Sequence, residues 1–308
     1  MVIKVVPYSS LWVKIFQEEA NIIKDRLKEK CLDIYHIGST SVYGLIAKPS
    51  VDILCIVDKL NDSLILEEVG FEFRGEMNIP LHYYFRRNKK INLHVTELDH
   101  GFIKLNLCFR NYLRVHQNIA LQYKNLKIEL LKNPNSHIKV DGKFSGYNLA
   151  KNQFIKSVLK KANFNGYCVN FCMHDDEWSE YHRIREREIF QPIRVNYDRN
   201  HFSLKDSNHY HFVLYKGVVI VSVAHIELID DKTAALRSLA TDEKHKNKGY
   251  ATYILTFLEK WVKLQKREVI KTHASLEAKD FYIKLGYKQM TFNDKSISKN
   301  IIDLGKII

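Results

Sequence analysis

The sequence predicts two consecutive domains of mixed α-helix and β-strand, at residues 1–165 and 166–308. The chain has 308 residues, about twice the length of a typical domain. Apolar residues alternate between strand-like and helix-like spacing, which favours α/β or α+β units over a sandwich. Residues 163–167, Asn-Phe-Asn-Gly-Tyr, interrupt this pattern and favour a turn, so they mark the boundary.

The composition excludes several classes of protein. Hydrophobic residues make up 45% and aromatic residues 12% of the chain, which excludes wholesale disorder. No apolar run is long enough to span a membrane, and the first residues lack the apolar core of a signal peptide. The five cysteines are scattered and odd in number, so we expect reduced thiols, a cytoplasmic protein and no membrane partner.

The first domain is predicted to open with a short strand that ends at Pro7, followed by a helix capped by Ser9 or Ser10. Helical spacing places these apolar residues on one face: Trp12, Ile15, Phe16, Ala20 and Ile23. The later elements are a strand, loop and strand at 34–57, a strand at 91–98 and two or three helices within 108–161.

The loop after residue 37 has the residue types of a phosphate site. Gly38 lets the backbone approach a phosphate, and the hydroxyls of Ser39 and Thr40 can donate hydrogen bonds to it. Asp52 begins the next strand, where a carboxylate can hold Mg²⁺ beside a nucleotide. Alone, these residues also fit an ordinary turn and a strand boundary.

The longer string at 36–53, HIGSTSVYGLIAKPSVDI, resembles the GrpB family. Pro7-Tyr8 with Trp12 and Phe16, Asn92 to Glu97, and Phe109 to Arg114 extend the resemblance over about residues 3–161. The resemblance implies a nucleotidyltransferase-like fold of the polymerase-beta superfamily. The implied nucleotide-binding residues are Gly38, Ser39, Thr40 and Lys48.

The metal site of that superfamily is incomplete in this sequence. The superfamily places two acids two residues apart on one strand and a third acid on another strand. Here Leu54 follows Asp52 at the second position and cannot ligate a metal, so we expect any Mg²⁺ to be held by Asp52 and Glu97, with His94 as a further candidate. Three hypotheses stay open: an active transferase, a nucleotide- or phosphate-binding module, and a structural domain without activity.

The second domain is predicted to mix strands with helices. The expected strands are 167–173, two strands within 209–228 joined at Lys216-Gly217, 234–241, 268–274 and about 287–291. The expected helices are 177–190, 249–266 and 275–285.

The polar loop between residues 241 and 249 suits an anion. The first N–H groups of a helix lack intrahelical partners, and the helix dipole adds positive charge there. Gly249 and Ala251 keep side chains away while Lys246 and Lys248 add charge, so a pyrophosphate fits. Without an anion, lysines at a helix N-terminus are unfavourable by ~0.3–1 kcal/mol.

This loop, Lys246-Asn247-Lys248-Gly249-Tyr250-Ala251, resembles the coenzyme loop of the GNAT acetyltransferases, with Lys246 where the family has Gln or Arg. The string at 278–287, AKDFYIKLGY, resembles the second motif of that family, and the resemblance spans about 167–292. It implies acetyl-CoA as donor, with the pyrophosphate on the loop and the pantetheine paired along Leu239, Ala240 and Thr241.

Acetyl transfer to an amine needs a proton acceptor for the amine and a donor for the departing thiolate. The resemblance gives the donor role to Tyr282, which by residue type alone would be a packed aromatic. Glu227, near the end of a strand, is the candidate base, and His225 on the same side of that strand is the alternative. By type, both also fit structural roles.

The basic stretch from Lys104 to Lys161 holds 12 basic residues against Glu129 and Asp141. Such an excess attracts phosphate, but Lys124 and Lys127 lie off the apolar stripe of their helix, which favours a solvated face. No nucleic-acid motif accompanies the stretch, so we expect nucleotide-sized phosphates as partners rather than nucleic acid.

Two further patterns have open interpretations. His209 and His211 alternate on a strand at a spacing that zinc can use, but no third ligand follows at motif spacing. Trp178, Tyr181 and Arg185 share one helix face, which fits either acceptor contact or core packing.

The sequence therefore predicts an N-acetyltransferase that moves acetyl from acetyl-CoA to a primary amine of a small molecule or peptide by direct attack. The first domain would bind a nucleotide or select the substrate. Two alternatives stay open: a bifunctional enzyme with both nucleotidyl and acetyl transfer, and a non-catalytic sensor of CoA or nucleotide.

Overall fold

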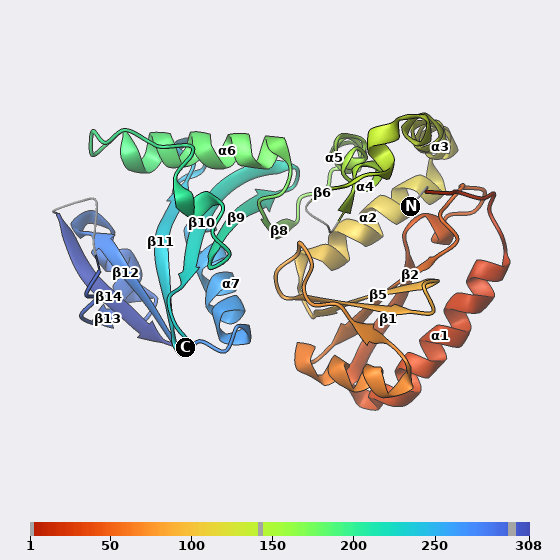
Figure 1. Cartoon of the computed structure of the whole chain (residues 1–308), viewed down its shortest axis with the longest axis horizontal. Helices are drawn as coiled ribbons and strands as arrows, with labels where there is room; N and C mark the ends of the chain where they lie inside the picture. Colours follow the sequence, from red (N-terminus) through yellow and green to blue (C-terminus); the bar gives the residue numbers. More distant parts are fainter. Residues whose placement is uncertain (1–2, 141–143, 295–299) are drawn as a thin grey trace. The chain divides into compact units, whose positions relative to one another are not determined.

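The computed structural model describes residues 3–140, 144–294 and 300–308. The chain divides into two compact units, Met1–Cys168 and Val169–Ile308, and each is described by itself. The predicted boundary at residue 165 lies a few residues before this division. Figure 1 shows a sheet with covering helices in each unit.

The first unit is built on a five-stranded mixed sheet of order β1-β2-β5-β4-β3. Its strands are β1 (Cys31–Ile37), β2 (Val51–Val57), β3 (Glu72–Phe73), β4 (His82–Arg87) and β5 (Ile91–Glu97). β2 and β5 are parallel, and the other pairings are antiparallel. The apolar residues 53–57 of β2 are all buried, which suits a strand with a neighbour on each side.

Helices cover both faces of this sheet, as Figure 1 shows for α1 and α2. The first unit contains α1 (Leu11–Leu27), α2 (Gly101–Val115), α3 (Gln117–Lys132), α4 (Gly146–Leu149) and α5 (Asn152–Lys161), with a small hairpin of β6 (Lys139–Val140) and β7 (Phe144–Ser145). Leu54 and Ile56 of β2 pack with Ile103 of α2, so the face of β2 that carries Asp52 lies toward α2.

The loop between β1 and β2 packs against the helices rather than projecting into solvent. Val42 and Leu45 share a core with Leu113 of α2, Ile119 and Tyr123 of α3 and Val158 of α5. The loop that carries Gly38, Ser39 and Lys48 is thereby held against α3.

The second unit has a seven-stranded sheet of order β13-β14-β12-β11-β10-β9-β8. Its strands are β8 (Tyr167–Phe171), β9 (His209–Lys216), β10 (Val219–Leu228), β11 (Thr233–Thr241), β12 (Val269–Ser275), β13 (Lys288–Gln289) and β14 (Ile301–Ile307). Its helices are α6 (Asp175–Arg185), α7 (Tyr250–Leu264) and α8 (Lys279–Lys284).

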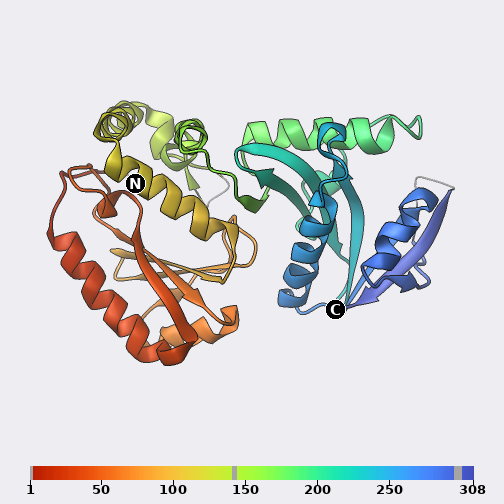
Figure 2. The ribbon, with the colours of Figure 1, turned by 180° about the vertical axis from the view of Figure 1, so that it is seen from behind.

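The alternation of side chains along β9 separates the two faces of this sheet. Phe212 contacts Trp261 of α7 at a ring distance of 5.0 Å, whereas His211 contacts Tyr181 of α6 at 5.2 Å. The helices α6 and α7 therefore cover opposite faces, as Figures 1 and 2 show.

Several predicted elements need correction. The helix expected at 177–190 ends at Arg185 and continues as a π-helical turn, Glu186–Phe190. The strand expected near 287–291 is only β13, and the long β14 pairs between β13 and β12. The opening strand is reduced to a single bridge between Val6 and Ala47.

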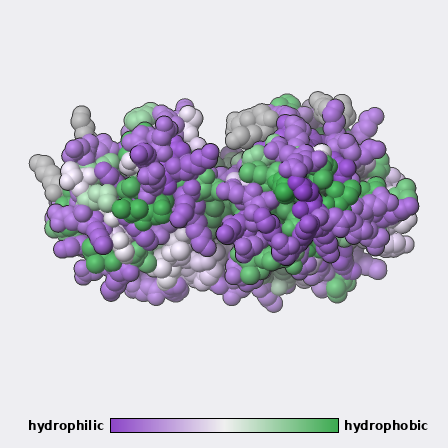
Figure 3. All heavy atoms as spheres, turned by 90° about the horizontal axis from the view of Figure 1, so that it is seen from below, coloured by the Kyte–Doolittle hydropathy of each residue, from purple (hydrophilic) through white to green (hydrophobic). Residues whose placement is uncertain are grey.

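Within the described residues, no helix is both long and apolar enough to cross a bilayer. On the face drawn in Figure 3, hydrophobic residues form separate groups among mainly hydrophilic ones.

Candidate functional sites

The loop between β11 and α7 presents an open helix N-terminus. Asp242 caps a short turn by accepting from Lys244 N at 3.0 Å, and the chain then reaches Gly249 in the left-handed region, at φ 79°. No side chain caps α7, and a β-carbon at Gly249 would meet nothing within 4 Å. The first turn of α7 therefore faces open space, as an anion would require.

The lysines of this loop are less available than the sequence suggests. Lys246 Nζ lies 2.6 Å from Glu188 Oε2, a buried carboxylate on the π-helical turn, and Lys248 Nζ donates to Lys244 O at 3.4 Å. The helix N-terminus and Lys248 thus supply the positive potential, while the charge of Lys246 is offset by Glu188.

The sheet of the second unit opens between β11 and β12. Their parallel pairing covers only Thr233–Ala235 against Val269–Lys271, although both strands continue. Figures 1 and 2 show the two halves of the sheet diverging from that point. Leu239, Ala240 and Thr241 pair with β10 on one side, so their other edge faces the opening.

Tyr282 lies where the two strands begin to diverge. Tyr282 belongs to α8 and its side chain is buried. The hydroxyl group of Tyr282 is hydrogen-bonded to Thr272. Thr272 Oγ1 in turn donates to Leu236 O at 2.9 Å, which ties the tyrosine to the first unpaired residues of both strands. Burial raises the pKa of Tyr282 to about 12, so the phenol is protonated at neutral pH and can donate a proton.

Glu227, the predicted base, is held in an ion pair. Arg237 is the extra residue of a bulge in β11, and its Nε donates to Glu227 Oε2 at 2.6 Å. Arg237 Nη2 contacts the same oxygen, so the pair occupies Oε2 and leaves Oε1 outside it. Glu227 is therefore not a free carboxylate, and its role as the base stays a prediction.

His225, the alternative base, is buried in a histidine cluster. Its Nε2 lies 2.8 Å from His209 Nδ1, and burial lowers its pKa well below the usual value. His211 is bonded to Tyr181 Oη at 2.7 Å and to Ser203 O at 2.9 Å, so it is not available with His209 for zinc. Tyr181 is fully buried, which favours its core-packing interpretation.

The first unit brings the predicted Gly38 and Asp52 into direct contact. Gly38 follows the last residue of β1 at φ 69°, and a β-carbon there would overlap Asp52 Oδ2. Only glycine allows this approach. Asp52 Oδ1 accepts from Asn92 Nδ2 at 2.8 Å, and burial raises the pKa of the carboxyl group.

The predicted partner of Asp52 at a metal, Glu97, lies elsewhere. In the parallel register Asp52 pairs with Asn92 and Val57 pairs with Glu97, so the acids are five residues apart along the sheet, roughly 16 Å. Glu97 Oε1 accepts from Leu60 N at 3.0 Å instead. His94 is bonded to His82 at 2.9 Å. Among the described residues, no group of three His, Cys, Asp or Glu side chains is placed to hold a metal ion.

The loop hydroxyls have different surroundings. Thr40 is buried and bonded to His36 Nε2 at 3.0 Å, so it does not face Asp52 as a ligand group. Ser39 Oγ accepts from Lys127 Nζ at 2.5 Å. Lys127 is only 2% exposed, which corrects the expectation that this residue lies on a solvated helix face.

Two arginines of α2 fix the backbone of the same loop. Arg110 Nη1 donates to His36 O at 2.9 Å, and Arg114 donates to Ser41 O from Nε at 3.0 Å and Nη2 at 2.7 Å. The first bond is to a residue near the end of β1, and the other two are to a carbonyl of the loop itself. The motif residues Arg110 and Arg114 therefore shape the loop.

Comparison with known proteins agrees with this division into two sites. The family model described as GrpB protein matches residues 2–161, more than half of the chain. The chain belongs to the GrpB family. Its second unit is a GNAT-fold domain, because the Acetyltransferase (GNAT) family model matches residues 171–287.

Individual relatives cover one domain or the other. The UPF0157 protein YqkA of Bacillus subtilis is 30% identical over 57% of this chain and 54% of its own, so this chain spans about half of that relative. The structure of GrpB from Enterococcus faecalis is 37% identical, covering 52% of this chain and 96% of its own, with TM-score 0.46. An acetyltransferase from Streptococcus agalactiae is 14% identical, covering 47% and 100%, with TM-score 0.39.

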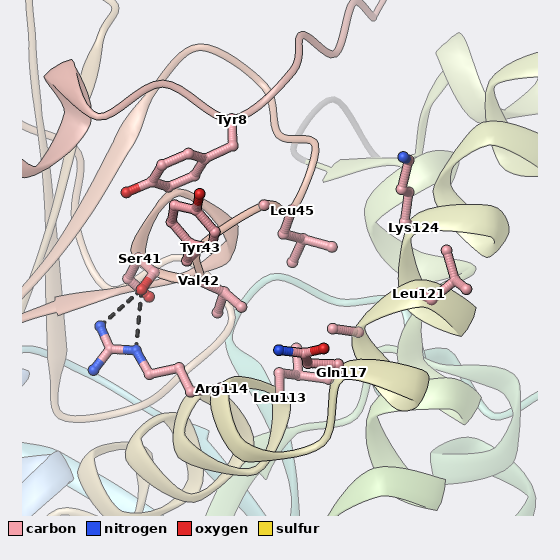
Figure 4. A pocket seen from close by; sticks show the side chains of 12 residues that line it. Tyr8, Ser41, Val42, Tyr43, Leu45, Leu113, Arg114, Gln117, Leu121 and Lys124 are labelled. Carbon is pink, nitrogen blue, oxygen red and sulfur yellow. Dashed lines mark hydrogen bonds between the residues drawn. The ribbon is translucent and has the colours of Figure 1, made fainter.

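The GrpB domain also has a hollow of about 600 Å³ beside the loop, shown in Figure 4. Tyr8, Tyr43 and Leu45 line it together with residues of α2 and α3, and Figure 4 shows Arg114 bonded to Ser41 at its margin. Its lining includes neither Asp52 nor Lys127. It is therefore separate from the site around Asp52.

Sequence reasoning missed several residues of the Asp52 site. Asp52 interacts with Lys127, Lys151 and Asn92. Lys48 donates a hydrogen bond to Asn148. The excess of basic residues in 104–161 was the available signal, but helical spacing alone could not show which lysine turns inward.

Proposed function

We propose that the chain is an N-acetyltransferase that transfers acetyl from acetyl-CoA to a primary amine of a small molecule or peptide. The observation that carries the proposal is Tyr282, a protonated phenol at the point where β11 and β12 diverge, in a GNAT-fold domain with an open helix N-terminus at Gly249.

The residues fit the coenzyme. A β-carbon at Gly249 meets no atom within 4 Å, so the helix N-terminus has room for a pyrophosphate. The free edge of Leu239, Ala240 and Thr241 can pair with the amides of pantetheine. Asn247, Lys248, Tyr250 and Ala251 complete the loop on the side of the pyrophosphate, with Lys246 beside it.

Acetyl-CoA supplies an activated thioester to this site. The amine attacks the acetyl carbonyl in a ternary complex, and Tyr282 donates a proton or a hydrogen bond to the sulfur as the C–S bond breaks. Because Glu227 is ion-paired with Arg237, we propose that the amine passes its proton to bulk water or to a chain of water molecules rather than directly to Glu227.

The GrpB domain binds a nucleotide or related phosphate ligand in this proposal. Gly38, Ser39 and Lys48 lie at one loop beside Asp52, and the basic residues around them favour an anionic ligand. Nucleotidyl transfer, the bifunctional alternative, is disfavoured because, within the described residues, Asp52 belongs to no group of three side chains that could hold a metal ion.

An amine panel tests the acetyltransferase proposal. Thiol release from acetyl-CoA should depend on the amine, and intersecting initial-rate lines should show a ternary complex. Tight acetyl-CoA binding without release on any amine would support the sensor alternative instead.

A further inference from the structure

Three lysines from separate segments converge on Asp52 in the GrpB domain. Lys48 comes from the loop before β2, Lys127 from α3 and Lys151 from the turn between α4 and α5. All three interact electrostatically with Asp52. We call Lys48, Lys127 and Lys151 the lysine cluster.

Neutral groups hold the cluster together. Asn148 Oδ1 accepts from Lys48 Nζ at 3.2 Å and from Lys151 Nζ at 3.3 Å. Both ammonium groups also lie over the ring of Tyr147, at 4.8 and 4.6 Å. Because Lys48 and Lys151 share the Asn148 oxygen and the Tyr147 ring, their two positive charges lie close together. Their mutual repulsion costs free energy unless an anion binds beside them.

Lys127 is the most deeply buried member. Its Nζ donates to Ser39 Oγ at 2.5 Å and to Ile46 O at 2.8 Å, and it lies 4.3 Å from the ring centre of Tyr123. Burial, helped by repulsion from Lys151, lowers the pKa of Lys127 to about 6. Burial and repulsion from Lys48 lower the pKa of Lys151 to about 8.

The charges of this site suit an anion better than a divalent cation. Three lysine side chains surround Asp52, and Leu54 and Asn92 stand where further acids would be needed. Lys127, whose pKa burial lowers to about 6, is largely neutral at pH 7 without a ligand, and a bound anion favours its protonated form. Mg²⁺ favours carboxylates and is repelled by nearby ammonium groups. The lysines thus supply the positive charge that a metal ion supplies in metal-dependent phosphate sites.

We propose that the lysine cluster and Ser39 form a metal-independent site for the phosphoryl groups of a nucleotide or another phosphate ester. Lysine acts on phosphate as a point charge, and the Ser39 hydroxyl adds a directed hydrogen bond. The inference deepens the proposed nucleotide recognition by the GrpB domain and rests on it. Asp52 then serves as a counter-charge to the lysines and not as a metal ligand.

Calorimetric titration of the full chain in EDTA tests this site. ATP, pyrophosphate and inorganic phosphate are the probes, and each titration is repeated with the Gly249→Glu variant, in which a carboxylate enters the anion site of the coenzyme loop. We expect binding in EDTA that changes less than about threefold when Mg²⁺ is added. Comparing the three probes shows whether the phosphoryl group alone or a whole nucleotide is recognised.

Matched variants locate the binding. Lys127→Met and Lys151→Met should each weaken it at least tenfold, while Lys124→Met, one turn earlier on α3, should leave it unchanged. Asp52→Asn should keep or tighten it, because a repelling charge is removed. Circular dichroism checks that each variant is folded. A similar loss of affinity in both lysine variants would show that the loss does not come from a local structural change in one of them.

Three results would overturn the proposal. Binding that requires Mg²⁺ and disappears in Asp52→Asn would leave nucleotide recognition in place but refute the lysine site. Binding in EDTA that survives both lysine substitutions would refute it as well. Failure of every probe under all conditions would refute both the lysine site and the proposed role of the GrpB domain, without bearing on acetyl transfer.

Discussion

Replacing Lys127 with methionine should stabilise the GrpB domain at neutral pH. An unfolded lysine is protonated at pH 7, whereas burial gives folded Lys127 a pKa of about 6, so folding must remove a proton. At 1.36 kcal/mol per pKa unit, lowering the pKa from 10.5 to about 6 costs about 5 kcal/mol at pH 7. The variant loses the bonds to Ser39 and Ile46, about 2 kcal/mol together, which leaves a net gain of about 3 kcal/mol.

The sign of the pH dependence follows from the same shift. Between about pH 6 and 10.5 the unfolded chain binds more protons at Lys127 than the folded chain, so wild-type stability from this group rises with pH. The advantage of Lys127→Met should therefore shrink with pH and vanish near about pH 9. The groups that face the Lys127 side chain are Asp52, Lys151, Tyr123 and Ser39, and none of them is substituted in the variant.

Scanning calorimetry of the full chain measures this effect. The transition of the GrpB domain should rise by about 5–10 °C at pH 7, and that of the acetyltransferase domain should not move. The second transition is an internal control for buffer and concentration. A lower GrpB transition at pH 7, with the wild-type pH dependence, would show that folded Lys127 is charged and satisfied, and would refute the reasoning.

Three further predictions concern the acetyltransferase domain. Tyr282→Phe should lower kcat about 100-fold with little change in acetyl-CoA affinity, whereas Tyr287→Phe, whose ring lies 5.3 Å away, should change kcat less than about threefold. Gly249→Glu should weaken acetyl-CoA at least about 30-fold in an equilibrium titration, because a carboxylate enters the anion site; Gly217→Glu, another positive-φ glycine, should not. Glu227→Gln should lower kcat less than about fivefold across pH 6–9, and a loss near 100-fold would restore Glu227 as the base.

The family and fold of the second domain could be predicted from the sequence because its motifs are local, whereas the roles of individual residues stay predictions. The loop 246–251 and Tyr282 each lie within a short string that also sets its own backbone, as the positive φ of Gly249 shows. What remained hidden were tertiary partners. The pairing of Lys246 with Glu188 and of Glu227 with Arg237 depends on a π-helical turn and a bulge.

The Asp52 site was harder because it depends on register and on distant segments. Glu97 lies on the strand beside Asp52, but a parallel register moves it five residues along the sheet. Lys127 is off the apolar stripe of its helix, yet the loop at Ser39 covers it. Periodicity identifies the face of a helix without saying what packs on that face.

The elements with a strong apolar pattern were predicted correctly, and a short element without such a pattern was not. The strongly periodic α1 and α7 and the apolar β2 have the expected type and place. The strand β14 was missed, since Asp303 and Lys306 break the apolar pattern of a short segment. β14 is stabilised by its pairing with β12, a tertiary contact that cannot be identified from the local sequence of the strand.

The fate of a labelled acetyl group tests acetyl transfer most directly. The full chain is mixed with acetyl-CoA labelled in the acetyl group and with each of a panel of primary amines, and the products are separated after one turnover. We predict that the label appears on the nitrogen of an acceptor amine, never on the protein, and that Gly249→Glu abolishes the transfer. Label that stays on CoA with every amine, or that is released only as acetate, would contradict it.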